Sequence, residues 1–305
     1  LLEEGFSSTA VMPVEIFHSA GQLWNDLHAS PAAPAFRVRT VSLDGGAVRS
    51  AHGLGVAPHG RMADVERTDI VIVSTSSLDL DLAMVANSAL LPWLRRQHGQ
   101  GALVVGVCMG AAYLAEAGLL DGRIATTHWA LADKFAARYP KVRWRSDQFV
   151  TEDNRLLCSG GVFASVDVSL YLVEKLCGHE MAVQTAKALL LPMPRIHQTG
   201  YAMHPISQAH GDERIRQVEA YLQTNFQKEI ATHDLAKRAG LGERTFVRHF
   251  KAATGQLPAG YVQALRIQAA KAMLERDTKP IQAIRYDDGY DDVAFFRSLF
   301  KRITS

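Results

Sequence analysis

The feature that most constrains the fold of this chain is a change in sequence periodicity across one Pro- and Gly-rich stretch. Before it, short β-branched runs alternate with longer helical patterns, and after it every apolar pattern has a helical period. The stretch itself, Leu191 to Gly211, has no apolar periodicity and is typical of a linker. The chain is therefore predicted to hold two domains of different class, in agreement with 305 residues at roughly 150 per domain.

Four short runs before the linker are predicted strands, and two of them are apolar on both faces. Strands of that kind lie at the centre of a sheet covered by helices, so we expect an α/β domain with a mainly parallel sheet. The predicted strands are Arg37–Ser42, Ile70–Ser74, Leu103–Val107 and Leu156–Ser159. The predicted helices are Val14–Asn25, Leu80–Gln97, Ala111–Ala117, Ala130–Tyr139 and Val166–Leu176.

The composition excludes several classes of protein. A hydrophobic fraction of 48% with 21% charged residues is enough to build a core, which excludes disordered and collagen-like chains. The three cysteines, Cys108, Cys158 and Cys177, have no metal-ligand spacing, so we expect a reducing, cytoplasmic location, no metal and no cofactor. Cys158 and Cys177 are predicted to be buried thiols. Neither a signal peptide nor a membrane helix is predicted.

The net charge of +2 is distributed unevenly along the chain. From Gly211 onward, 16 Lys and Arg stand against 12 Asp and Glu, a net charge of +4. The first 210 residues hold 17 and 19, a net charge of −2. The basic excess therefore lies in the helical part, where it favours a polyanionic partner.

The helical part contains an internal duplication at a 49-residue offset. Apolar residues lie five before, six after and ten after Gly240, and the same spacing recurs around Gly289. These residues are Leu235, Phe246 and Phe250 in the first unit and Ile284, Phe295 and Leu299 in the second. A helix, a glycine turn with positive φ and a second apolar helix form a helix-turn-helix unit. The alternative is a plain helical bundle in which both glycines only end helices.

Exposed polar side chains favour the helix-turn-helix interpretation. The helix after Gly240 carries donors for phosphates and base edges on or near its outer face. The predicted DNA-binding residues are Arg244, Thr245, Arg248 and His249 in the first unit and Arg297 and Ser298 in the second. Four aspartates around the second turn, Asp287, Asp288, Asp291 and Asp292, would repel phosphate. The second unit is therefore the weaker candidate.

The segment HDLAKRAGLGERTFVRHFKAATGQLPAGYVQALRIQAAKAML, residues 233–274, resembles the DNA-binding domain of AraC/XylS-type transcription regulators. The segment IQAIRYDDGYDDVAFFRSLFKR, residues 281–302, resembles it as well. The resemblance implies two helix-turn-helix units joined by a long helix over Pro258–Glu275, each presenting a recognition helix to successive major grooves. The implied partners are double-stranded DNA and, if the protein activates transcription, RNA polymerase.

The segment LVVGVCMGAAYL, residues 103–114, places Cys108 in a Gly-x-Cys-x-Gly turn between a buried strand and a helix. This is the nucleophile-elbow pattern, and the amide N–H groups of a helix N-terminus favour a thiolate. Cys108 is therefore a candidate nucleophile, and the nearest downstream histidine is His128. The alternative is a small buried thiol in a glycine-rich turn.

The wider context resembles the class I glutamine-amidotransferase-like superfamily, in particular its branch fused to AraC-type domains. The resemblance rests on AEAGLLDGRIATTHW, residues 115–129, and SGGVFASVDVSLYLVEKL, residues 159–176. It implies a flavodoxin-like sandwich with a pocket at the carboxyl ends of the strands. We predict a sensor domain over residues 1–195 that also dimerises, a linker over 196–211 and an AraC-type DNA-binding domain over 212–305.

Some hydrolytic relatives place an acidic residue near the elbow, four positions before a proline, and here that position is Thr9. Without a carboxylate to assist the thiol, we expect an effector pocket that does no catalysis. Its predicted residues are Thr9, Ser76, Ser77, Cys108, Met109, Thr127, His128 and Trp129. The resemblance points to a nitrogen-containing metabolite as the small-molecule effector, and Trp129 offers an aromatic wall for a cation. The alternative function is a cysteine-dependent amidase or hydrolase using Cys108 and His128.

Overall fold

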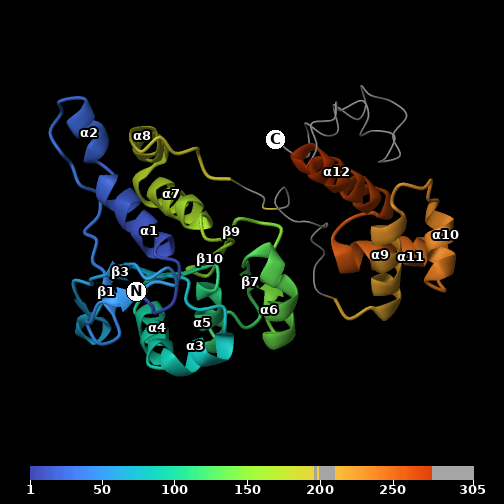
Figure 1. The fold of residues 1–305 in the computed structure, drawn as a ribbon, viewed down its shortest axis with the longest axis horizontal. Coiled ribbons are helices and arrows are strands. Elements are labelled where there is room, and N and C mark those ends of the chain that lie inside the picture. The colour runs from blue at the N-terminus through green and yellow to red at the C-terminus, as the bar shows by residue number, and fades with distance from the viewer. Residues whose placement is uncertain (196–197, 199–209, 277–305) are drawn as a thin grey trace. The chain divides into compact units, whose positions relative to one another are not determined.

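The computed structural model describes residues 1–195, 198 and 210–276 (Figure 1). The chain divides into two compact units, Leu1–Gln198 and Thr199–Ser305. Most of the predicted linker, residues 196–211, lies outside the described residues, so the predicted domain limits stay a prediction. No helix in the described ranges is both long and apolar enough to cross a lipid bilayer.

The first unit is built on one four-stranded sheet. In spatial order its strands are β5 (Ile70–Val73), β6 (Leu103–Val107), β10 (Leu156–Ser159) and β9 (Val150–Asp153). The first three strands run parallel, and β9 pairs antiparallel with β10. Strand β6 lies at the centre because its valines are apolar on both faces, and Val104, Val105 and Val107 are fully buried. The predicted mainly parallel sheet is confirmed.

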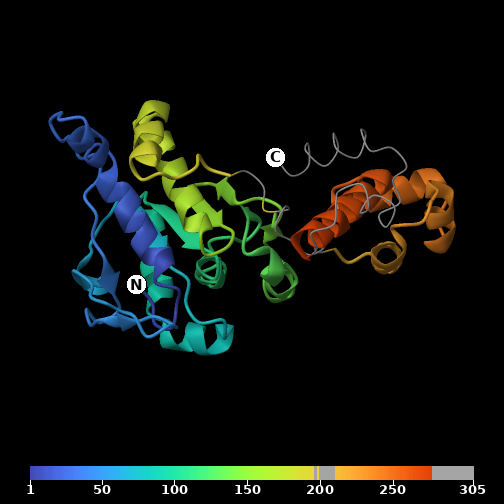
Figure 2. The same ribbon diagram turned by 45° about the horizontal axis from the view of Figure 1, so that its top comes forward.

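Helices cover both faces of this sheet (Figures 1 and 2). On one side lie α1 (Ser8–Ser19), α7 (Ala164–Cys177) and α8 (His179–Ala188), and on the other α3 (Leu80–Ala86), α4 (Leu90–Gly99) and α5 (Gly110–Glu116). Their apolar faces meet the sheet in one core that includes Ile16, Tyr113, Leu114 and Leu172. The remaining short elements are α2 (Leu23–Leu27), β1 (Val41–Ser42), β2 (Val48–Arg49), β3 (Gly55–Val56), β4 (Gly60–Arg61), β7 (Ile124–Ala125), α6 (Ala132–Arg138) and β8 (Arg143–Trp144).

Three predicted elements of this unit are wrong in extent. The helix predicted over Val14–Asn25 is divided into α1 and α2, because Gly21 between them has a positive φ of 76°. The strand predicted over Arg37–Ser42 shrinks to β1, which pairs with β4 outside the main sheet, because residues 37–41 are exposed or only half-buried. The helix predicted over Leu80–Gln97 is split into α3 and α4 at Asn87. The Asn87 side-chain amide donates to the Ala83 carbonyl at 2.8 Å, and Asn87 ends α3 with non-helical backbone angles.

The second unit is helical throughout its described part, with α9 (Glu213–Asn225), α10 (Thr232–Arg238), α11 (Glu243–Thr254) and α12 (Pro258–Arg276). Its core contains the predicted apolar stripes: Ile215, Val218, Leu222, Leu235, Ala236, Ala239, Phe246, Phe250, Tyr261 and Leu265. Gly240 between α10 and α11 has φ of 64°, which is the positive angle predicted for the turn. The first helix-turn-helix unit is confirmed, while the second, with Arg297 and Ser298, lies outside the described residues.

Candidate effector site and DNA-binding surface

The turn between β6 and α5 has the geometry of a nucleophile elbow. Cys108 has φ of 53°, a strained angle for a non-glycine residue. The turn is possible only because glycines flank it. A Cβ on Gly106 would lie 2.7 Å from the backbone of Ala111, and one on Gly110 would lie 2.4 Å from the Val73 carbonyl oxygen. The Gly-x-Cys-x-Gly pattern therefore serves close backbone packing at the carboxyl ends of β5 and β6.

The Cys108 thiol is buried, with 4% of the residue exposed. Burial raises the pKa of this thiol, and it outweighs the opposing effect of the hydrogen bond with the Thr75 side chain. The thiolate expected from the helix N-terminus is therefore not favoured, because desolvation is the larger effect. Within the described part of the chain, no hydrogen bond joins Cys108 to His128, whose Nδ1 is bonded to the backbone N–H of Ala130.

Thr9 is tied into the scaffold beside the elbow. Its hydroxyl donates to the Phe6 carbonyl at 2.6 Å and accepts the backbone N–H of Thr75 at 3.1 Å. The Thr75 hydroxyl in turn donates to the Val107 carbonyl at 3.0 Å. Thr9 and Thr75 thus link α1, the loop after β5 and the Cys108 turn through hydroxyls and backbone groups.

Most other predicted pocket residues are also buried and hydrogen-bonded within the fold. The Ser76 hydroxyl accepts from the Tyr113 hydroxyl at 2.7 Å, and the Thr127 hydroxyl donates to the Cys108 carbonyl at 3.2 Å. Met109 is completely buried in the core. The structure therefore brings these residues together around the elbow as a floor rather than as an open rim.

Three of the predicted pocket residues, Ser77, His128 and Trp129, are half-exposed and available to a ligand. His128 Nδ1 accepts the backbone N–H of Ala130 at 3.1 Å, and the His128 and Trp129 ring centroids are 5.4 Å apart. Burial lowers the pKa of His128, so its imidazole is neutral at pH 7. None of these three residues lines the small pocket of this unit that the sequence did not predict, which is lined in part by Gly5, Phe6, Ser74 and Thr75.

Sequence reasoning also missed two contacts that fasten the end of the α/β unit to this site. The side-chain amide of Gln198 is buried against Thr127, and the Arg195 guanidinium bonds the buried carboxylate of Asp167. Asp167 belongs to the segment 159–176 that carries the family resemblance. Its partner Arg195 lies 28 residues further along the chain, so no local pattern indicates the pairing. Cys177, predicted to be buried, is exposed because it is the last residue of α7, while Cys158 is buried as predicted.

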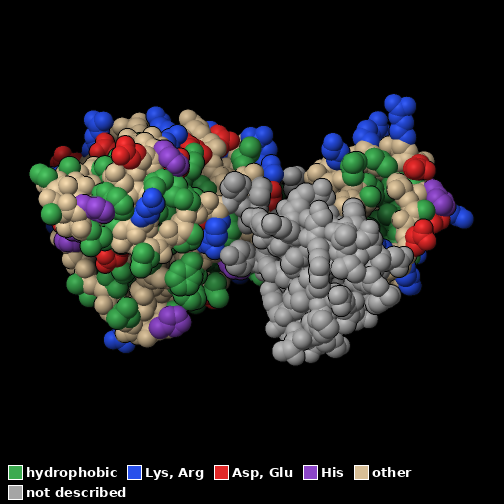
Figure 3. Space-filling model, turned by 90° about the horizontal axis from the view of Figure 1, so that it is seen from above, with side chains coloured by type: hydrophobic (Ala, Val, Ile, Leu, Met, Phe, Trp, Pro, Cys, Tyr) green, Lys and Arg blue, Asp and Glu red, His purple; other side chains and the backbone are tan. Residues whose placement is uncertain are grey.

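The outer face of α11 is basic. Arg244, Arg248 and Lys251 are exposed and spaced four and three residues apart, so they form one line on the helix. Phe246 and Phe250 occupy the opposite, buried face. Among the described residues, no carboxylate pairs with any of these three cations, which leaves them available to an anion. Figure 3 shows Lys and Arg side chains projecting from the described part of this unit.

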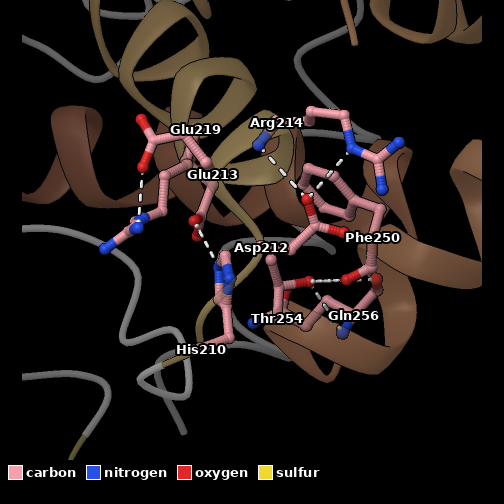
Figure 4. A network of polar contacts seen from close by, with 9 residues as sticks. His210, Asp212, Glu213, Arg214, Glu219, Phe250, Thr254 and Gln256 are labelled. Atoms are coloured by element: carbon pink, nitrogen blue, oxygen red, sulfur yellow. Dashed lines mark hydrogen bonds and ion pairs between the residues drawn. The ribbon is translucent and has the colours of Figure 1, made fainter. Parts of the chain in front are cut away.

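The other two predicted DNA-binding residues of α11, Thr245 and His249, are half-buried. His249 Nδ1 lies 3.0 Å from an Asp212 carboxylate oxygen. Figure 4 shows that Asp212 also caps α9 by accepting the Arg214 backbone N–H. The hydrogen bond from His249 is the main reason that the pKa of Asp212 falls to about 2. His249 therefore holds α11 against the start of α9.

Beside Asp212, His210 Nε2 meets the buried Glu219 carboxylate at 2.8 Å (Figure 4). This second histidine–carboxylate contact joins the residues before α9 to α9 itself. The α11 helix, which carries the basic line, is thus held by the polar His249–Asp212 contact as well as by its buried phenylalanines.

Fold and site together define a class: an α/β domain with a cysteine elbow, joined to a helix-turn-helix domain. Comparison with family models agrees. Residues 10–175, over half of the chain, match the DJ-1/PfpI family, and residues 235–305 match a helix-turn-helix domain. The chain belongs to the DJ-1/PfpI family and carries an AraC-type helix-turn-helix domain, so the two resemblances predicted from its sequence are confirmed.

Individual proteins resemble either the whole chain or part of it. The chain is 27% identical to the HTH-type transcriptional regulator CdhR of Pseudomonas aeruginosa, over 99% of this chain and 87% of CdhR. It is 32% identical to isonitrile hydratase of Pseudomonas putida over 49% of this chain and 63% of that enzyme. A crystal structure of an AraC family transcriptional regulator from Pseudomonas putida superposes with a TM-score of 0.52 and 22% identity, covering 62% of this chain and 95% of that one. The last match supports the flavodoxin-like fold.

Proposed function

We propose that this protein is a sequence-specific DNA-binding transcription regulator whose α/β domain binds a small-molecule effector. The observation that carries the proposal is the basic line of Arg244, Arg248 and Lys251 on α11, with which no carboxylate of the described residues pairs. It follows a glycine turn and lies opposite the apolar face of the helix, as a recognition helix requires. The similarity to CdhR along nearly the whole chain supports the same function.

The α11 residues have different roles in this proposal. Arg244 and Arg248, near the N-terminal half of the helix, reach base edges, where arginine pairs bidentately with guanine. Lys251, one turn further on, neutralises a phosphate. Thr245 supports phosphate contact, and His249 positions the helix through Asp212. In the second unit, Arg297 and Ser298 remain the candidates on sequence grounds.

In the α/β domain, we propose that the elbow has become an effector site without catalytic activity. The buried, protonated thiol, the hydroxyl of Thr9 in place of a carboxylate and the hydrogen bond of His128 Nδ1 with the Ala130 backbone all support this role. Ser77, His128 and Trp129 contact the ligand, and the buried residues around them shape the floor. The ligand is a nitrogen-containing metabolite, and the protein acts as a homodimer.

Two observations favour a second candidate, a hydrolase or hydratase that uses Cys108. The strained φ of Cys108 is retained, and part of the chain is similar to isonitrile hydratase. Turnover of an amide or isonitrile by the wild type that is lost in Cys108→Ser would establish this candidate. Absence of turnover in both proteins is the result we expect.

The DNA-binding proposal is tested by selecting bound duplexes from a random pool with the full chain. We expect one enriched motif for the wild type and loss of enrichment for Arg248→Ala. Lys228→Ala, which alters an exposed lysine between α9 and α10, is the matched control and should select the same motif as the wild type. Recovery of random sequences by the wild type would contradict sequence-specific binding.

A further inference from the structure

The side chain of Gln198 fills a buried slot lined by hydrogen-bond acceptors. Its Nε2 donates to the Thr127 carbonyl at 2.8 Å, to the Gln148 carbonyl at 3.0 Å and to the Thr126 hydroxyl at 3.3 Å. The Thr126 hydroxyl gives its own proton to the Gln148 carbonyl at 2.8 Å, so it faces Gln198 as an acceptor. Only 2% of Gln198 is exposed. A slot of three acceptors selects a group that carries several N–H donors and rejects a carboxylate.

This slot adjoins the Cys108 elbow. Thr127 forms one wall with its carbonyl and, through its hydroxyl, donates to the Cys108 carbonyl at 3.2 Å. The opposite wall is Gly160, directly after β10, where an added Cβ would lie 2.7 Å from Gln198 Oε1. Thr126 and Thr127 follow β7, and Gly160 follows β10. The slot therefore lies at the carboxyl ends of these strands, which is where α/β sheets bind ligands.

Contacts of different strength hold the segment that carries Gln198, and they include a backbone hydrogen bond from the Gln198 N–H to the Asp147 carbonyl at 2.9 Å. Arg195 donates from its backbone N–H and its guanidinium to Asp167, which is 2% exposed, and the guanidinium lies 4.2 Å from the Phe149 ring centroid. Breaking that tie would leave a buried charge unpaired. The Gln198 tie consists of neutral hydrogen bonds, which another donor can replace at little net cost. Of these contacts, the side-chain hydrogen bonds of Gln198 are therefore the ones that a ligand can replace.

We infer that the slot is a subsite of the effector pocket for a primary amide or ammonium group, and that Gln198 occupies it as an internal competitor. This inference rests on the proposed effector function of the α/β domain. The effector's nitrogen takes the place of the carboxamide on the same three acceptors. Gln198 is the last residue of the α/β unit. When the effector displaces its side chain, the change is passed to the part of the chain that continues to the DNA-binding unit.

The test uses propionamide, which has the atoms of a glutamine side chain from Cβ outward. In the full chain carrying Gln198→Ala, the slot is vacated and its acceptors are left unpaired. A ligand that binds only the folded state raises the melting temperature, by about 3–5 °C at ten times its Kd for a domain of this size. We expect this rise in Gln198→Ala with propionamide and no rise with propionate.

Matched variants separate the slot from general effects. The wild type and Gln184→Ala, which removes an amide that donates to the exposed Glu180, should show no shift with propionamide because Gln198 still fills the slot. Gln198→Glu keeps the size of the side chain but turns an acceptor toward three acceptors. The new carboxylate should therefore leave the slot, and this variant should respond to propionamide as Gln198→Ala does. It covers the case in which the alanine variant fails to fold.

Gly160→Ala gives a complementary result. The added methyl group meets the far end of a flexible side chain, so the carboxamide moves while the backbone stays. This variant should lose the Gln198 contact yet gain nothing from propionamide, since the methyl group narrows the slot. A folded Gln198→Ala protein with no propionamide shift, or an equal shift with propionate, would overturn the inference. Failure of the wild type to bind DNA would instead overturn the regulator function and leave the slot intact.

Discussion

The Thr9 hydroxyl accepts the backbone N–H of Thr75 at 3.1 Å, with both residues buried. Thr9 stands at the position where some hydrolytic relatives carry an acidic residue. Thr9 serves as a brace between α1 and the loop that follows β5, and it offers the thiol of Cys108 no proton acceptor of its own. Both hydrogen bonds of the Thr9 hydroxyl therefore serve the fold.

Replacing Thr9 by alanine should destabilise the α/β domain. The substitution leaves the buried backbone N–H of Thr75 without its acceptor, which costs about 1–3 kcal/mol of unfolding free energy. Thr9→Ser keeps the hydroxyl and should remain close to the wild type. Urea unfolding of the full chain, followed by circular dichroism, measures the difference. Equal loss in both variants would show that the methyl group matters rather than the hydrogen bond.

Cys108 should react slowly with iodoacetamide at neutral pH. The reactive species is the thiolate, and burial both raises the pKa of Cys108 and excludes the reagent. Cys177, which is exposed, should be alkylated first. Mass spectrometry of the two peptides over a time course provides the comparison, with Cys108→Ser to confirm the peptide assignment. Faster labelling of Cys108, above all below pH 7, would restore the nucleophile hypothesis.

Local sequence patterns predicted the fold class and the elbow but not the state of the site. Apolar runs and glycine spacing specify β6, the Cys108 turn and the Gly240 turn, because each depends on a few neighbouring residues. The environment of Cys108 depends on Thr75, and the filled slot depends on Gln198, both distant in sequence. Burial and long-range pairing of this kind leave no periodic signal, so the raised pKa and the slot required the structure.

The α11 helix shows the same division between local and distant information. Its apolar face and its exposed arginines follow from helical spacing alone. The role of His249 does not, because its partner Asp212 lies before a different helix, 37 residues away. A histidine predicted to touch DNA is therefore found bonded to a helix cap.

Breaking the Arg195–Asp167 pair from the arginine side should be costly. Arg195→Ala leaves a buried carboxylate uncompensated, and we expect a loss of about 3 kcal/mol in unfolding free energy. Asp167→Asn combined with the same Arg195→Ala change removes both charges and should recover much of that loss. A double-mutant cycle by urea unfolding measures the coupling. Additive effects of the two single changes would mean that the pair does not couple the segment to α7.

The His249–Asp212 contact should make the stability of the helical domain depend on pH at the acidic end. The pKa of Asp212 is lowered from 3.8 to about 2, so its contribution is fully present above about pH 4 and is lost as the pH falls through 2. The melting-temperature difference between wild type and Asp212→Asn should therefore be larger at pH 4 to 5 than at pH 2. His249→Ala should abolish most of this difference. A difference that persists unchanged at pH 2 would refute the assignment.

The central claim, that α11 is a recognition helix, is tested most directly by the salt dependence of DNA binding. Fluorescence anisotropy with the selected duplex should give an affinity that falls steeply with salt, and Lys251→Ala should reduce the slope of log K against log salt by about 1. Arg248→Ala should weaken binding by about 1–3 kcal/mol, and Lys228→Ala should leave affinity unchanged. Wild-type affinity and slope in both α11 variants would contradict the claim.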